Sequence, residues 1–171
     1  MKKLHTTRLE LVAGTYELCE AEITNPNVLA RMLHAQAPDD WPPPLNDEQS
    51  QRYFLDILRN PETVGWCVWY VILAANARRV LIGNCGFKGQ PRDGKVEIGY
   101  SIVPAFQRRG YASEAVNSLA QWAFADPRLE RIFAETRPQL HASIGVLRKT
   151  KFLPCQDASE AGSLRFVRSR A

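Results

Sequence analysis

Three strand-like segments follow one another in the middle of the chain, and they constrain its fold more than any other feature. The first, WCVWYVIL at residues 66–73, is apolar throughout, which predicts a central strand buried on both faces. The turns ANARR and KGQPRDG join it to VLIGNCGF at residues 80–87 and to VEIGYSIV at residues 96–103. Because these connections are short, we expect the three strands to form an antiparallel meander.

A strand-helix-strand unit is expected to overlap the end of the meander. Apolar residues recur at helical spacing between Ala112 and Ala123, and RIFAET at residues 131–136 is strand-like. Together the meander and this unit predict an α/β fold, in which a mixed, mainly antiparallel twisted sheet is flanked by about four helices.

The first third of the chain is predicted to carry one strand and several short helices. RLELVAG at residues 8–14 alternates apolar and polar side chains, as a strand does. From Thr15 to His34 the apolar positions take helical spacing, with a break at Asn25–Pro26 that suggests two helices. After the prolines of PDDWPPPLNDEQ, Asn46 and Gln49 resemble a capping box, which predicts the start of another helix.

The C-terminal part is expected to close the sheet. A helical stretch from Ala142 to Lys149 is followed by a strand around Leu164 to Val167, with DASEAG as a loop or hairpin between them. Neither an internal repeat nor a linker divides the chain. We therefore expect residues 1–171 to form a single domain.

Length and composition favour a globular protein: of the 171 residues, 45% are hydrophobic and 23% are charged. No apolar run approaches the ~20 residues of a membrane-spanning helix, and Met1 precedes no signal-like segment, so we expect a cytoplasmic protein without a membrane partner. The four cysteines and three histidines are scattered, so we expect reduced thiols and no metal site.

The charge balance is compatible with an anionic ligand. The formal net charge is +4, but no basic tract alternates with stacking aromatic residues, so no direct nucleic-acid partner is expected. The sequence makes no prediction of the oligomeric state.

The segment QRRGYA at residues 107–112 joins a predicted strand to a predicted helix. The N-terminus of a helix exposes backbone N–H groups, and with the helix dipole these groups form a site for phosphate. Gly110 has no Cβ, so a ligand can approach the backbone there. The alternative is a turn that simply requires a glycine.

This segment resembles the acyl-CoA binding motif of the GNAT N-acetyltransferase superfamily, Q/R-x-x-G-x-G/A, which lies after a strand and before a helix. Gln107, Gly110 and Ala112 match its fixed positions. VEIGYSIVP is similar to the preceding strand in the branch that contains ribosomal-protein alanine N-acetyltransferases, and SIGVLRKTKF is similar to a later helix of that branch. The resemblance covers roughly residues 8–153 and implies the GNAT fold.

The resemblance implies a site for acetyl-CoA, the acetyl donor, and no metal. Backbone N–H groups from Arg108 to Ala112 would hold the pyrophosphate, and main chain near Ile102 and Val103 would pair with the pantetheine arm. The side chains of Arg108 and Arg109 could contact the phosphates or could simply be solvated. The cofactor-binding residues implied are Ile102, Val103, Gln107, Arg108, Arg109, Gly110, Tyr111, Ala112 and Ser113.

Glu97 is the candidate for the base that deprotonates an attacking amine. The period of a strand places it on one face with Gly99 and Ser101, where a carboxylate between small residues can face a cleft. Similar enzymes carry a glutamate here that acts as a base, directly or through water. The alternative is a structural ion pair with a basic neighbour.

A proton donor for the leaving thiolate is harder to identify. Many GNAT members place a tyrosine late in the last helix, where this chain has Leu147. In the ribosomal-protein branch a serine at the start of that helix is a substitute, and Ser143 stands there; its alternative role is helix capping. Leu140 and Lys151 replace the Asn and Gly of the family pattern. A reaction without a dedicated acid is also possible, because thiolate is a tolerable leaving group.

The amine acceptor is expected to meet the loop HAQAPDDWPPPLNDE. Asp40 could receive a cationic amine by charge and Trp41 by a cation–π contact, or Trp41 could pack down as part of the core. Asn84 and Trp69 are further candidates for lining the site. The identity of the acceptor does not follow from the sequence.

Three functions remain open at this point. The first is transfer of the acetyl group of acetyl-CoA to a primary amine, either a protein N-terminus or a small molecule, by direct attack in a ternary complex. The alternative is a catalytically weak or inactive CoA-binding regulatory module, which the missing tyrosine suggests. Nucleotide binding is disfavoured because the chain has neither GxxxxGK[ST] nor GxGxxG.

Overall fold

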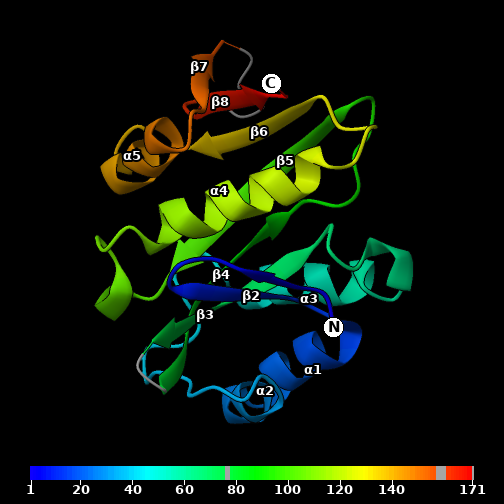
Figure 1. The fold of residues 1–171 in the computed structure, drawn as a ribbon, viewed down its shortest axis with the longest axis vertical. Helices are drawn as coiled ribbons and strands as arrows, with labels where there is room; N and C mark the ends of the chain where they lie inside the picture. Colours follow the sequence, from blue (N-terminus) through cyan, green and yellow to red (C-terminus); the bar gives the residue numbers. More distant parts are fainter. Residues whose placement is uncertain (76–77, 157–160, 171) are drawn as a thin grey trace.

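The computed structural model describes residues 1–75, 78–156 and 161–170, and in them one sheet carries helices on both sides (Figure 1). The strand order is β1-β2-β3-β4-β5-β6-β8-β7. The strands are β1 (Lys3–His5), β2 (Leu9–Ala13), β3 (Val68–Ala75), β4 (Arg78–Phe87), β5 (Lys95–Ile102), β6 (Arg131–Thr136), β7 (Leu153–Cys155) and β8 (Leu164–Ser169). The helices are α1 (Tyr16–Thr24), α2 (Pro26–Met32), α3 (Glu48–Ile57), α4 (Tyr111–Phe124) and α5 (His141–Lys149), with short 3-10 turns η1 (Pro61–Thr63) and η2 (Pro104–Phe106).

The register of β5 and β6 creates the main irregularity of the sheet. Neighbouring strands pair antiparallel except β5 and β6, which are parallel. These two pair only from Lys95–Arg131 to Glu97–Phe133, whereas β5 continues to pair with β4 as far as Ile102. The two strands therefore diverge beyond Glu97, and main-chain groups of β5 on that side have no strand partner.

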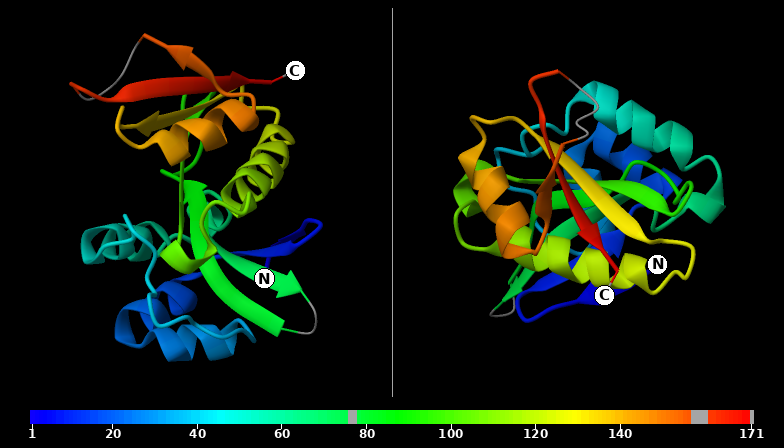
Figure 2. Two further views of the ribbon diagram at one scale, coloured as in Figure 1. Left: turned by 90° about the vertical axis from the view of Figure 1, so that its left-hand side faces the viewer. Right: turned by 90° about the horizontal axis from the view of Figure 1, so that it is seen from above.

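The two faces of the sheet are covered by different helices (Figure 2). One core cluster packs β-strand residues against α4 and α5, with Val116, Leu119 and Leu147 fully buried. The other packs the opposite face against α1 to α3, with Leu29 and Tyr70 fully buried. The predicted mixed, mainly antiparallel α/β sheet is confirmed, with five α-helices in the described residues rather than about four.

Several boundaries differ from the predictions. The strands β1 and β7 were not predicted, because three residues are too few to show a strand period. Helix α3 begins one residue later than the Asn46 cap implies: the Asp47 side chain accepts a 2.9 Å bond from the Ser50 N–H, and Asn46 turns inward. The turn ANARR (residues 75–79) and the connection DASEAG (residues 157–162) include residues 76–77 and 157–160, which lie outside the described residues.

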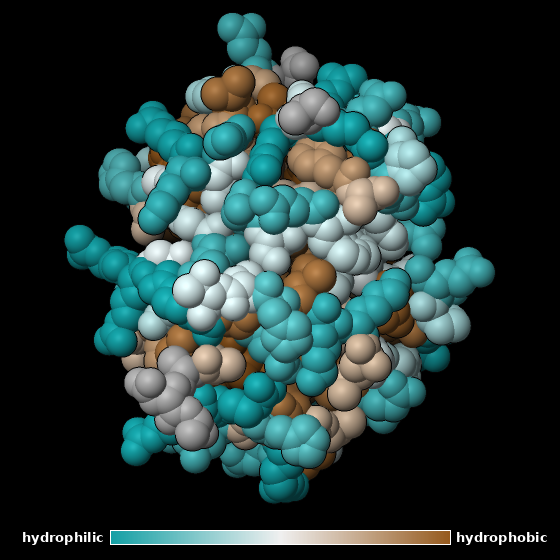
Figure 3. All heavy atoms as spheres, in the orientation of Figure 1, coloured by the Kyte–Doolittle hydropathy of each residue, from teal (hydrophilic) through white to brown (hydrophobic). Residues whose placement is uncertain are grey.

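The remaining features of the fold are its surface and its four cysteine thiols. Within the described ranges, no helix is both long and apolar enough to cross a membrane. The face in Figure 3 is mostly hydrophilic, with apolar residues scattered over it. All four cysteines are free, and burial raises the pKa of the thiols of Cys19 and Cys67 to about 12.

Candidate functional site

The loop before α4 turns sharply at two residues in the left-handed region. Arg108 has φ +61° and Gly110 has φ +83°, so the chain reverses from η2 into the helix within a few residues. A Cβ on Gly110 would lie 3.4 Å from Nη2 of Arg8 and 3.8 Å from Nζ of Lys149. The positive φ favours glycine, and the missing Cβ leaves the backbone accessible beside two cationic side chains.

The N-terminus of α4 is free of any side-chain cap. Gly110 is its N-cap residue, and no side chain of the described residues caps the first turn, where Tyr111, Ala112 and Ser113 lie. A depression of about 250 Å³ adjoins this turn, lined by Arg8, Gly110, Ser113, Glu114, Asn117, Lys149 and Thr150. Unpaired N–H groups, the helix dipole and two cations here suit an anionic group.

Arg8 braces this loop from a distant part of the chain. Its guanidinium donates to the Arg109 carbonyl at 3.1 Å and to Oε2 of Glu114 at 2.8 Å, and it lies 4.5 Å from the ring centroid of Tyr111. Burial raises the pKa of Glu114, but hydrogen bonds from Thr6 and Arg8 outweigh it and hold that pKa below 4.5. No sequence signal connects Arg8 with a loop about a hundred residues away, so the motif alone does not identify it.

At the end of β5, the main-chain groups of Ile102 and Val103 point to opposite sides of the strand, although both residues were expected to pair with the pantetheine arm. The N–H of Val103 donates to the Ile82 carbonyl at 2.9 Å, so it is already used within the sheet. Main-chain groups alternate in direction along a strand, so Ile102 points away from β4 and toward the diverging β6. Its carbonyl accepts a 2.8 Å bond from the Gln107 side chain, which fixes the turn.

Glu97 lies on the α1–α3 face of β5 and is engaged by a basic neighbour. Its side chain is 22% exposed and forms a close ion pair with Lys88, which follows β4. The alternative role of Glu97, a structural ion pair with a basic neighbour, is therefore present in the structure. The exposed fraction still leaves part of the carboxylate open to a ligand or to water.

Ser143 and Tyr100 meet on the opposite face of β5. The Tyr100 hydroxyl lies 3.0 Å from both the carbonyl oxygen and Oγ of Ser143. Burial raises the pKa of Tyr100 to about 12, although the bond to Ser143 opposes the shift. Ser143 makes no cap contact, because Leu140 is the N-cap residue and no side chain caps α5. Leu147, at the family's tyrosine position, is fully buried in the core.

Tyr100 is the hydroxyl that sequence reasoning missed. The strand period of VEIGYSIV places it on the apolar face with Ile98 and Ile102, where it reads as a core residue. Only the packing of α5 against β6 brings Ser143 to it. The two predicted catalytic side chains, Glu97 and Ser143, thus lie on opposite faces of β5, near the point where β5 and β6 part.

The expected acceptor residues divide into three groups. Asp40 is exposed, and its Oδ2 lies 3.5 Å from the Ala105 N–H. Trp41 packs down onto Tyr70, with ring centroids 6.5 Å apart, and Asn84 is buried on the same face. Trp69 lies on the other face, where its indole N–H donates to the Gly65 carbonyl at 2.8 Å, so it does not line this side.

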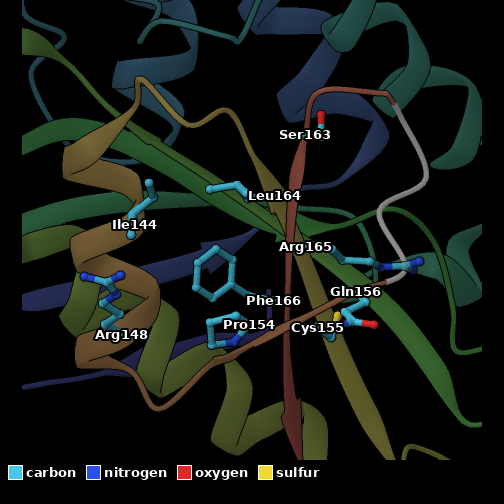
Figure 4. A pocket seen from close by; sticks show the side chains of 9 residues that line it. All are labelled: Ile144, Arg148, Pro154, Cys155, Gln156, Ser163, Leu164, Arg165 and Phe166. Carbon is cyan, nitrogen blue, oxygen red and sulfur yellow. The ribbon is translucent and has the colours of Figure 1, made fainter.

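A larger cavity of about 410 Å³ lies elsewhere, between α5 and the β7–β8 pair (Figure 4). Its described lining includes Ile144, Arg148, Cys155 and Phe166 but none of the residues predicted to act in the site. In the part of the chain that the structure describes, no three His, Cys, Asp or Glu side chains gather in a way that could hold a metal ion.

Comparisons with known proteins agree with this architecture. Residues 15–153 match the family model of the acetyltransferase (GNAT) domain. YjdG of Bacillus subtilis (strain 168), an uncharacterized N-acetyltransferase, is 29% identical over 157 residues, which span 90% of each chain.

Two solved structures share the fold. The ribosomal-protein-S5-alanine acetyltransferase of Vibrio fischeri superposes with a TM-score of 0.70 at 17% identity, covering 99% of this chain and 97% of that one. A ribosomal L7/L12 α-N-protein acetyltransferase in complex with coenzyme A gives a TM-score of 0.67 at 19% identity and 98% coverage of both chains. The chain therefore belongs to the GNAT acetyltransferase family and is an N-acetyltransferase.

Proposed function

We propose that this protein transfers the acetyl group of acetyl-CoA to a primary amine, of a protein N-terminus or a small molecule, by direct attack in a ternary complex. The observation that carries the proposal is the uncapped N-terminus of α4, with Gly110 at its start, beside the divergence of β5 and β6. A structural relative in complex with coenzyme A supports the choice of ligand.

The residues of the loop fit the phosphates of acetyl-CoA. Backbone N–H groups from Arg108 to Ala112, with Ser113 in the first turn, bind the pyrophosphate, and the missing Cβ of Gly110 leaves room for it. Lys149 adds positive charge beside the same turn. The gap-facing main chain of Ile102 pairs with the pantetheine arm as a further strand would, while Gln107 holds the turn in place.

The proposed proton acceptor and the proposed proton donor lie on opposite faces of β5. When bound, acetyl-CoA supplies an activated thioester. Glu97 accepts the proton of the amine, directly or through a water, after its bond to Lys88 loosens. On the other face Ser143, held by Tyr100, donates a proton to the departing thiolate and regains one from solvent, to which Glu97 in turn releases the proton that it accepted. Formation of the amide bond and cleavage of the thioester then leave free CoA and an acetylated amine.

The alternative is a regulatory module that binds CoA without turnover. The engagement of Glu97 by Lys88 and the buried Leu147 favour it. Such a module would bind acetyl-CoA through the same loop but would release no thiol from any amine.

The test combines calorimetric titration with acetyl-CoA and thiol release in the presence of a panel of amines. We expect binding by the wild-type protein, loss of binding in Gly110→Trp, and thiol release with at least one amine. Gly89→Trp is the matched control, because Gly89 also has positive φ and has open space where a Cβ would stand, yet lies outside the loop. Absence of binding by the wild-type protein would overturn the proposal, and binding without thiol release would favour the regulatory module.

A further inference from the structure

One buried hydroxyl on the α4–α5 face of the sheet makes no hydrogen bond to the rest of the described chain. Thr136, the last residue of β6, is 6% exposed, and its Oγ1 has no partner among the described residues. Burying a hydroxyl without a partner costs free energy, because water would otherwise satisfy it. Such an atom in a folded protein therefore needs an explanation, and a ligand that completes it is one.

The side chain of Thr136 lies on the same face as the proposed proton donor. Side chains alternate along a strand, so Thr136 shares a face with Ala134, which packs in the core beneath α4 and α5. The direct partner of Thr136 on β8 is Leu164, and Figure 4 shows the Leu164 side chain directed toward α5. Paired residues point to the same side of a sheet, so Thr136 faces α5 as well.

The register of the sheet places Thr136 opposite Tyr100. The last residues of β5 and β6 that pair are Glu97 and Phe133. Tyr100 and Thr136 each lie three positions farther along their strands, where the two strands have diverged. There the Tyr100 hydroxyl contacts Ser143 instead. Tyr100 and Thr136 therefore stand on either side of the divergence, on one face of the sheet.

The proposed function places the arm of acetyl-CoA in this divergence. An extended arm that pairs with Ile102 lies about 4.8 Å from β5, on the side of β6. The arm carries amide groups and ends in the thioester, so its carbonyl oxygens need donors once they leave water. A threonine hydroxyl is able to donate one hydrogen bond, and that of Thr136 is not used within the described chain.

The connection from β6 to α5 is the part of the surroundings that can move. Residues 137–140 are all exposed, and α5 begins after Leu140 without a side-chain cap from the described residues. Leu140 is 41% exposed and offers no hydrogen-bonding group at the position where the family pattern has an asparagine. Because Oγ1 of Thr136 is enclosed in this structure, an outward shift of this connection is what admits the arm to it.

We propose that the Thr136 hydroxyl donates a hydrogen bond to a carbonyl oxygen of the acetyl-CoA arm. This inference rests on the proposed function and adds a cofactor-binding residue that lies outside the QRRGYA motif. The acceptor is either the thioester carbonyl or an amide carbonyl of the pantetheine. The place of Thr136 across from Tyr100, which holds the proposed proton donor, favours the thioester. A bond to the thioester oxygen strengthens as negative charge develops there during attack by the amine.

Calorimetric titration of the wild-type protein and Thr136→Val with acetyl-CoA and with free CoA tests the inference. Valine keeps the shape of the side chain and removes the hydroxyl. We expect Thr136→Val to bind acetyl-CoA about fivefold more weakly than the wild-type protein does. Unchanged affinity for free CoA would identify the thioester carbonyl as the partner, and an equal loss for both ligands would identify an amide carbonyl. Equal affinities of the two proteins for acetyl-CoA would overturn the inference.

Thermal unfolding of the unliganded proteins separates a ligand contact from a role in the fold. Thr136→Val removes an unpaired group, so its unfolding temperature should equal or exceed that of the wild-type protein. Thr63→Val is the matched control, because the Thr63 hydroxyl donates to the carbonyls of Asn60 at 2.7 Å and Ile57 at 3.0 Å. The control should lose stability and keep its affinity for acetyl-CoA. The same pattern in Thr136→Val would show that its hydroxyl serves the fold alone.

Thr136→Ser provides a second route if Thr136→Val folds poorly, since serine keeps the hydroxyl and loses only a methyl group. It should keep most of the affinity for acetyl-CoA, and a loss as large as that of Thr136→Val would overturn the inference. Failure of the wild-type protein to bind acetyl-CoA would overturn the proposed function and this inference together. Binding by the wild-type protein that neither substitution weakens would overturn this inference alone.

Discussion

The loop before α4 and a buried polar cluster on the other face of the sheet are built in opposite ways; this Glu22 cluster consists of Glu22, Trp41, Asn46, Tyr70 and Asn84. The loop consists of consecutive residues, and its expected ligand contacts are mainly backbone N–H groups around Gly110. The cluster is assembled from side chains of α1, residues 39–46, β3 and β4; its two bonds to Glu22 join residues 24 and 48 positions apart. One region is defined by local conformation and the other by the packing of distant segments.

The difference determines how each region responds to substitution. A backbone site tolerates most side-chain changes as long as the turn and the helix start are preserved. A side-chain cluster is altered by a single substitution. The predictions below test whether the two regions really act separately.

The largest effect is expected for Glu97→Gln. Loss of a general base should lower kcat roughly 100-fold or more, while the affinity for acetyl-CoA stays unchanged because Glu97 is not part of the loop. Steady-state kinetics and calorimetry measure the two quantities. Glu62→Gln, an exposed glutamate in η1, should change neither. A parallel loss of affinity for acetyl-CoA would show that Glu97 also supports the conformation of the loop.

A smaller effect is expected for Tyr100→Phe. Removing the hydroxyl leaves Ser143 without its partner, and kcat should fall about tenfold with little change in the KM for acetyl-CoA. Ser143→Ala should have a similar effect, and the double variant should be no worse than either single one, because the two hydroxyls act as a unit. Tyr53→Phe, at an exposed tyrosine, serves as the control. Additive losses would mean that the hydroxyls act independently.

Arg8→Ala tests whether the loop before α4 keeps its conformation without a contact from a distant part of the chain. The guanidinium ties the Arg109 carbonyl to Glu114, so its loss should weaken acetyl-CoA binding about fivefold by loosening the turn. Calorimetry measures the change. Arg52→Ala removes another arginine from an exposed ion pair, with Glu48, and should leave binding unaltered. An unchanged affinity in Arg8→Ala would show that the loop holds its conformation without the brace.

The smallest effects concern the pH dependence of stability, which should have opposite signs in the two regions. The pKa of Glu114 is lowered by the fold, so its stabilisation is present above pH 4.5 and is lost as pH falls through its folded-state pKa. The pKa of Glu22 is raised by burial, so the folded state loses stability as pH rises through that pKa. Cys19 and Tyr70, which face Glu22, have pKa values raised to about 12 and well above 10, so they do not titrate in the same range.

Urea unfolding between about pH 2 and pH 8 should show this contrast, because the Glu114 contribution changes below pH 4.5 and the Glu22 contribution above it. Relative to the wild-type protein, Glu114→Gln should become less stable as pH rises, and Glu22→Gln should become more stable. The same trend in both variants would mean that the two carboxyl groups share one environment, contrary to their placement on different faces of the sheet.

By itself the sequence determined the elements whose signals are local. The strands at residues 66–73, 80–87 and 96–103, the helix after Gly110 and the strand at residues 131–136 all appear in the structure close to their predicted bounds. Their periodicity and their flanking turns are written in consecutive residues, and that order identified the family. The turn that we propose to bind phosphate belongs to the same class, because a glycine at a helix start is visible in the sequence without any partner.

Only the tertiary structure decided how distant side chains meet. The contact of Tyr100 with Ser143, the brace from Arg8 and the use of the Val103 N–H within the sheet depend on strand register and helix packing. The sequence left open whether Trp41 faces solvent or the core. In the structure it packs in the core, because Tyr70 offers an apolar surface beneath it. The cost of burying a charge depends on which partners the fold brings to it, so Glu22, an ordinary residue in the sequence, became distinctive only once its surroundings were in place.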